Sequence, residues 1–216
     1  MRYIISLFLV LLIYCQVQGL AAPPQNPPES AKSILIIEKF TDKNFTKDPE
    51  WWVFDNVQMS VTTDGRLSVK GKAADWYVGG MGTYLAQEGR DLSKYNSLEI
   101  DVWGNGPNSG VIKIELYDDD NGNMQIEQDP QKSYTPLYDD RLVYELKVDW
   151  KGLKHISIPL SEFEDNNPEA GDNIWNPQQS KGSGGLLQMQ FIFVAASKTG
   201  RVDLQLDNIG FKEAKK

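Results

Sequence analysis

Glu99 and Asp101 are the residues whose spacing best suits acid–base chemistry. They lie in the run Leu98-Glu-Ile-Asp-Val-Trp103, where a strand would project both carboxylates from one face. Retaining glycoside hydrolysis needs two carboxyl groups about 5–5.5 Å apart, one of which acts as the general acid. The next place on this face, where that acid would stand, is Trp103. We therefore predict a noncatalytic strand, and glycoside hydrolysis stays an alternative.

Aromatic side chains on outward strand faces indicate a different chemistry. Trp103 and Tyr117 alternate with apolar residues and have carboxylates and a lysine beside them. The apolar C–H faces of sugar rings pack on aromatic rings, and sugar hydroxyls pair with carboxylates and amides. We predict a sugar site in which four aromatic residues stack on sugar rings and three polar residues bond hydroxyls. These are Trp76, Trp103, Tyr117 and Trp175, and Asp101, Glu115 and Gln190. The alternative is that a loop covers this outward face.

Two other motifs have simpler interpretations. The run Asp118-Asp-Asp-Asn-Gly-Asn123 suggests a calcium loop, but the place of the bidentate glutamate of an EF-hand falls on Asp129 in one register and on Pro130 in the next. We therefore predict an acidic hairpin tip. His155 is the single histidine and has no Ser or Cys motif near it, so we predict a structural role.

Composition excludes several classes of protein. The 216 residues carry 22 Lys+Arg and 30 Asp+Glu, a formal net charge of −8, so we expect no nucleic-acid partner. One cysteine cannot form an intrachain disulfide, and one histidine cannot supply a multi-histidine zinc site. The 18 glycines and 11 prolines favour a globular chain with many turns.

The N-terminal residues are typical of export. Residues 1–21 hold one arginine and an apolar run that is shorter than the roughly 20 residues a spanning helix needs, so we predict a signal peptide cleaved after Gly19 or Ala21. No transmembrane segment is expected after cleavage. A lipoprotein signal ending at Cys15 is the alternative, disfavoured by Tyr14. Residues 22–32 form a Pro-rich linker. We expect a secreted or periplasmic protein.

Alternation with period 2, rather than a helical period, dominates the rest of the chain. We predict an all-β domain at 33–213, folded as a two-sheet β-sandwich of the jelly-roll, galactose-binding-domain-like type. The expected strands are Ile34–Phe40, Val57–Thr62, Leu67–Lys70, Trp76–Tyr84, Leu98–Trp103, Val111–Tyr117, Met124–Glu127, Val143–Val148, His155–Leu160, Leu187–Ala195 and Val202–Asp207.

Turn residues bound these strands. Thr63-Asp-Gly65 predicts one tight hairpin and Asp120-Asn-Gly-Asn123 predicts another, because Asn-Gly supplies the positive φ angles of a type I′ turn. Residues from Glu164 to Gly185 form a long polar segment, and a loop of that length in a compact domain is often functional.

Several motifs between Ile36 and Phe211 occur in an order typical of one group of proteins. They are Ile37-Glu38-x-Phe40, Trp52, Gly65-Arg-Leu-Ser-Val-Lys70, Asp91-Leu-Ser-Lys-Tyr95, Leu98–Trp103, Gly104-Asn-Gly106, Ile112–Asp118, Trp150, Ile156-Ser-Ile-Pro-Leu-Ser-Glu-Phe163, Gly200-Arg-Val202 and Leu206-Asp-Asn-Ile209. By these motifs and their order, the chain resembles carbohydrate-binding modules with a galactose-binding-like jelly roll. The resemblance is greatest to the family 11 glucan-binding modules and the complex I intermediate-associated protein group.

The resemblance implies a noncatalytic domain with a glucan-binding face. It also implies a structural calcium ion between the first and last strands, where Glu38 and Asp207 match the expected acidic positions. The aromatic ladder of the glucan binders is not found in this sequence. We expect a secreted, noncatalytic binder of a polysaccharide or oligosaccharide. The alternative is an envelope structural or protein-partner-binding jelly roll without a sugar site.

Overall fold

The computed structural model describes residues 33–46, 50–85, 91–175, 177–179 and 183–214. The predicted signal peptide and linker lie outside these residues. Within the described part of the chain, no helix is long and apolar enough to cross a membrane.

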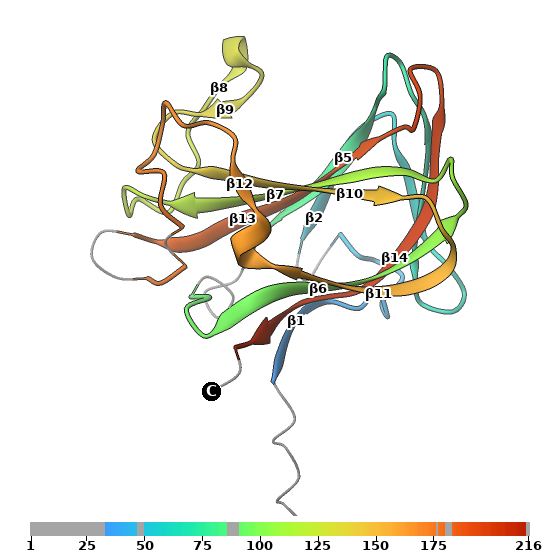
Figure 1. The fold of residues 1–216 in the computed structure, drawn as a ribbon, viewed down its shortest axis with the longest axis horizontal. Helices are drawn as coiled ribbons and strands as arrows, with labels where there is room; N and C mark the ends of the chain where they lie inside the picture. The colour runs from blue at the N-terminus through green and yellow to red at the C-terminus, as the bar shows by residue number, and fades with distance from the viewer. Residues whose placement is uncertain (1–32, 47–49, 86–90, 176, 180–182, 215–216) are drawn as a thin grey trace, which may run out of the picture. The chain divides into compact units, whose positions relative to one another are not determined.

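The described residues form two large antiparallel sheets (Figure 1). We call the first the β6 sheet; its order is β11-β6-β14-β4-β3, with β1 also paired to β14. The second, the β7 sheet, has the order β12-β10-β7-β13-β5-β2. A small third sheet pairs β8 (Gln128–Asp129) with β9 (Thr135–Pro136).

The strands of the β6 sheet are β1 (Ile34–Glu38), β3 (Gln58–Val61), β4 (Leu67–Lys72), β6 (Tyr95–Asn105), β11 (Lys151–Pro159) and β14 (Arg201–Glu213). Those of the β7 sheet are β2 (Trp51–Asp55), β5 (Tyr77–Tyr84), β7 (Gly110–Asp119), β10 (Arg141–Val148), β12 (Glu164–Asp165) and β13 (Gly185–Val194). Two short 3₁₀ helices, η1 (Pro130–Lys132) and η2 (Leu160–Glu162), lie in connections.

One hydrophobic core takes side chains from both sheets. Alternate residues of each strand enter it, for example Ile112, Ile114 and Leu116 of β7, because successive side chains of a strand point to opposite faces. The β6 sheet contributes in the same way from Ile100 and Val102. The predicted β-sandwich is therefore confirmed, and the residues between the core positions form two outer faces.

Most strand predictions agree with the structure, and the hairpin at 63–65 joins β3 to β4 as expected. The predicted strand Met124–Glu127 and the hairpin before it are wrong, because the Asp119 carboxylate accepts hydrogen bonds from the backbone N–H groups of Gly122 and Met124. These bonds stabilise a turn after β7. Strand β7 therefore pairs with β10 and β13 and not with residues 124–127. Strand β2 was not predicted.

Candidate functional site

The outer face of the β7 sheet gathers aromatic and polar side chains. Because Met189, Phe191 and Phe193 of β13 enter the core, Gln188 and Gln190 project from the opposite face. The same alternation and the strand register define what we call the outer β7 face. Its residues on β2, β5, β7 and β13 are Trp52, Phe54, Tyr77, Gly80, Gly82, Tyr84, Val111, Lys113, Glu115, Tyr117, Gln188, Gln190, Ile192 and Val194.

Two glycines of β5 allow aromatic rings to lie directly over the sheet. Trp52 is opposite Gly82, and Phe54 is opposite Gly80. A β-carbon on Gly82 would lie 2.5 Å from the Trp52 ring, and one on Gly80 would lie 2.5 Å from the Phe54 ring. The Trp52 and Tyr84 rings are 5.3 Å apart at 43°, and Tyr84 is 49% exposed. The pair therefore offers an aromatic surface beside the polar strands.

Glu115 is the centre of the polar part of this face. The Tyr117 hydroxyl donates to its Oε2 at 2.5 Å, and Lys113 Nζ lies 3.0 Å from its Oε1. Burial and the Glu115 charge raise the pKa of the Tyr117 hydroxyl. Gln190 on the adjacent strand β13 is the register partner of Glu115. Its side-chain amide donates a hydrogen bond to Gln188 Oε1 at 2.6 Å. With Tyr117 only 2% exposed, its hydroxyl orients Glu115 while its ring offers little surface for stacking.

Trp76 lies at the other end of β5. It is 47% exposed and helps to line a hollow of about 190 Å³ together with Val111, Val194 and Lys147. The neighbouring Tyr77 hydroxyl donates to the Asp55 carboxylate. Burial, with Asp55 as the second cause, raises the pKa of Tyr77. Aromatic side chains thus stand at both ends of β5.

The outer face of the β6 sheet carries Glu99 and Asp101, which His155 of β11 bridges. Its Nε2 lies 2.8 Å from Glu99 Oε2 and its Nδ1 lies 2.7 Å from Asp101 Oδ1. The side chain of Glu99 is 2% exposed and also accepts hydrogen bonds from the hydroxyls of Ser97 and Ser157. These two carboxylates are therefore held in a hydrogen-bonded network within the sheet.

The network sets the protonation of its members. Although burial raises the pKa of Glu99, the hydrogen bonds from Ser157, Ser97 and His155 outweigh it and hold that pKa below its usual value. The hydrogen bond to Asp101, and then the one to Glu99, raises the pKa of His155 against the opposing effect of burial. Asp101 and Glu99 thus favour the protonated, imidazolium form of His155.

The seven predicted sugar-site residues are distributed over three places. Trp76 is at the end of the β7 sheet, and Glu115, Tyr117 and Gln190 are on its outer face. Asp101 and Trp103 are on the outer face of the β6 sheet, where the Arg66 guanidinium lies 4.4 Å above the Trp103 ring. Trp175 is partly buried against the core.

Trp52, Tyr77 and Tyr84 were not among the predicted site residues. A signal for Trp52 was present in the sequence, because Trp51-Trp-Val-Phe54 is rich in strand-forming residues. A second signal was the run Gly79-Gly-Met-Gly82, since glycines inside a strand often mark a close approach by another group.

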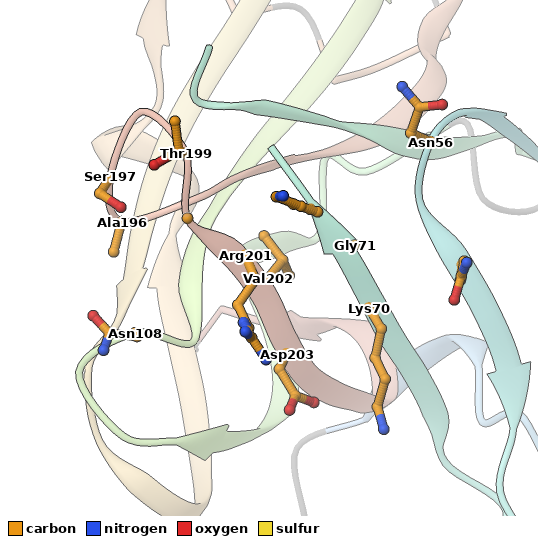
Figure 2. A pocket seen from close by; sticks show the side chains of 13 residues that line it. Asn56, Lys70, Gly71, Asn108, Ala196, Ser197, Thr199, Arg201, Val202 and Asp203 are labelled. Atoms are coloured by element: carbon orange, nitrogen blue, oxygen red, sulfur yellow. The ribbon is translucent and has the colours of Figure 1, made fainter. Parts of the chain in front are cut away.

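A separate basic hollow of about 1020 Å³ lies at the ends of β4 and β14 (Figure 2). Lys70, Lys72 and Arg201 contribute its positive charge, and the turn at 196–200 forms one wall. In Figure 2, Lys70, Arg201 and Asp203 stand on neighbouring strands. None of the predicted sugar-site residues lines this hollow.

The predicted calcium ligands Glu38 and Asp207 lie on the paired strands β1 and β14. Glu38 Oε1 accepts hydrogen bonds from the backbone N–H groups of Lys39 and Phe40 at 2.7 and 2.6 Å, and Trp51 Nε1 donates to its Oε2 at 3.3 Å. Burial, with Asp101 as a further cause, raises the pKa of Asp207. Glu38 thus acts here as a hydrogen-bond acceptor, and its role as a calcium ligand stays a prediction.

A group of three acidic residues does meet elsewhere among the described residues. One carboxylate oxygen from each of Asp118, Asp120 and Asp140 lies within 4.8 Å of the others. These three could hold a metal ion. Asp140, the residue before β10, thus approaches the 118–123 run, which no strand at 124–127 follows.

Comparison with solved structures identifies the fold. The family 11 carbohydrate-binding module of the cellulosomal cellulase Lic26A-Cel5E of Clostridium thermocellum matches with a TM-score of 0.54 and 17% identity, over 86% of this chain and 97% of that one. A family 11 module of the same organism in complex with a β-1,3-1,4-mixed-linked tetrasaccharide matches at 0.55 and 18%, over 86% and 98%. This chain has the β-sandwich fold of a carbohydrate-binding module.

The same fold occurs within a larger enzyme. The agarase AgWH50C matches with a TM-score of 0.52 and 13% identity, over 84% of this chain but only 26% of the agarase. No protein-family model and no curated protein matches the sequence. The predicted resemblance to family 11 modules is confirmed at the level of the fold, and the resemblance to the complex I intermediate-associated group stays a prediction.

Proposed function

We propose that this chain is a secreted, noncatalytic polysaccharide-binding protein whose binding surface is the outer β7 face. The observation that carries the proposal is the Trp52–Tyr84 ring pair over Gly82, beside Gln190, which is paired with the buried Glu115. An apolar surface with a few convergent polar groups is what a sugar chain requires.

The size of the face supports a chain of several sugars. From Tyr77 to Tyr84, β5 rises about 23 Å at about 3.3 Å per residue. The exposed aromatic residues Trp76 and Tyr84 stand at its two ends. A glucan is the ligand class we favour, because one of the matched modules was solved with a mixed-linked tetrasaccharide.

The state of the two strand carboxylates supports a noncatalytic role. Glu99 is buried and Asp101 is bonded to both His155 and the Asn208 amide, so neither is placed to attack or protonate a substrate. A reducing-sugar assay on mixed glucans is expected to show no release. Release that is lost in E99Q would favour the glycosidase alternative.

Affinity electrophoresis tests the proposed function. The mature chain is run through gels containing β-1,3-1,4-glucan, xylan or mannan. Retardation by at least one glycan, most strongly by the glucan, is expected. If no glycan retards the chain and a pull-down returns a stable protein partner, the envelope or partner-binding alternative replaces the proposal.

Export and calcium are further parts of the proposal. The N-terminus of the mature protein is expected to follow Gly19 or Ala21, which N-terminal sequencing of secreted material would check. A lipid-modified Cys15 would instead establish a membrane anchor. A calcium ion held by Glu38 and Asp207 would join β1 to β14, and E38Q is the variant that removes one of its ligands.

A further inference from the structure

The end of β7 and the start of β10 bring three aspartates together. Asp118 and Asp140 are fully buried, and Asp120 is partly buried. The Asp140 backbone N–H donates to Asp120 Oδ2 at 2.9 Å, and the Asp118 N–H donates to the Asp140 carbonyl at 3.3 Å. The backbone itself therefore fixes the separation of the carboxylates.

One oxygen of Asp140 faces this cluster without a donor. Asp140 Oδ2 accepts a hydrogen bond from the Ile174 N–H at 3.0 Å, but no donor among the described residues reaches Oδ1. A β-carbon on Gly171 would lie 1.9 Å from Asp140 Oδ1 and 2.5 Å from Asp120 Oδ2, so both oxygens face the same small space. Buried polar atoms in native proteins almost always have a partner.

The neighbouring Asp139 also has a buried carboxylate oxygen without a hydrogen-bond donor among the described residues. Asp139 is fully buried, and the oxygen is its Oδ2. Neither Asp139 nor Asp140 forms an ion pair with any described lysine, arginine or histidine. Buried acidic groups of this kind are stabilised by a bound cation.

We infer that Asp118, Asp120 and Asp140 bind one calcium ion. The donor set is made only of carboxylate oxygens, which hard cations prefer, and holds no thiolate or imidazole that would select zinc. Calcium accepts irregular oxygen coordination, whereas magnesium requires near-octahedral geometry. The ion joins the turn after β7 to the start of β10, and it is separate from the predicted Glu38–Asp207 site.

Calorimetric titration with calcium chloride and with magnesium chloride tests this site. The full mature chain is first freed of metal with EDTA, and its thermal unfolding is followed with and without calcium. D140N and D118N each remove one charged ligand while keeping the side-chain shape. D149N, an exposed aspartate paired with Lys147, is the matched control, and E38Q reports on the other predicted site.

The wild type and D149N are expected to bind calcium more tightly than magnesium and to melt at a lower temperature in EDTA. D140N and D118N are expected to bind one calcium ion fewer, or to bind it at least about tenfold more weakly. Their melting in EDTA is expected to be no lower than that of the wild type, because like-charge repulsion is reduced. Absence of calcium binding by the wild type, or wild-type affinity in both D140N and D118N, would overturn the inference.

Discussion

Glycines of β5 decide how closely aromatic rings approach the outer β7 face. In G82A, the new methyl group would lie 2.5 Å from the Trp52 ring and must displace it. We expect a loss of stability of about 1–3 kcal/mol, as for other overpacking substitutions, together with weaker glycan binding. Urea unfolding and affinity electrophoresis measure the two effects. Unchanged glycan retardation in G82A would show that the position of the indole is unimportant.

Gly171 has the same importance for the acidic cluster. Its φ of +71° is unfavourable for other residues, and a methyl group there would lie 1.9 Å from Asp140 Oδ1. We expect G171A to lose more than about 1 kcal/mol of stability and to bind calcium more weakly. Thermal unfolding and calorimetry check this. Wild-type calcium affinity in a folded G171A would contradict the placement of the ion.

At the scale of the strands, His155 connects β11 to β6 in a pH-dependent way. Its pKa is raised in the folded state by Asp101 and Glu99, while Lys212 of β14 lies 3.6 Å from Glu99. Because a raised pKa favours the imidazolium, its stabilisation is complete below the unfolded value of about 6.5 and is lost as pH rises through the folded pKa.

H155Q removes this titration. The difference in unfolding free energy between the wild type and H155Q is expected to be largest near pH 6 and to shrink as pH rises through the folded pKa of His155. Urea unfolding across that range measures it. A difference that grows with pH would show that the neutral imidazole is the stabilising form.

The core side of β13 carries much of the packing between strands. Phe191 is fully buried, and its ring centroid lies 5.9 Å from that of Trp51. F191A is expected to cost about 3–5 kcal/mol, as for other buried phenylalanine truncations. I192A, on the outer side of the same strand, is the control and is expected to cost less. Equal losses in the two variants would contradict the assigned alternation.

Local patterns predicted most strands because alternation is a property of neighbouring residues. The strand β2 escaped this reasoning, since Trp51-Trp-Val-Phe54 is apolar without a break. The strand predicted at Met124–Glu127 failed for another reason. There the Asp119 carboxylate accepts hydrogen bonds from the backbone N–H groups of Gly122 and Met124, which a hairpin would have paired with a neighbouring strand.

Across the whole molecule, the site could be predicted only in part. Alternation shows that Trp103 and Glu115 both point outward, but it does not say that they belong to different sheets. That information lies in pairings between distant strands. The same limit applies to the acidic cluster, because Asp140 joins Asp118 only through the pairing of β10 with β7.

The two outer faces differ in what they offer a ligand. On the β6 sheet, the Arg66 guanidinium lies over the Trp103 ring, and His155 pairs with the carboxylates of both Glu99 and Asp101. On the β7 sheet, Trp52 and Tyr84 form a ring pair with Tyr84 half-exposed. Our central claim is therefore that sugars bind to the outer β7 face.

Calorimetric titration of W52A and W103A with the glycan that retards the wild type tests this claim most directly. Each variant removes one indole, from the β7 and β6 sheets respectively. We predict that W52A weakens binding at least about tenfold, equivalent to about 1.4 kcal/mol, while W103A binds as the wild type does. Loss of binding in a folded W103A with unchanged binding in W52A would contradict the account.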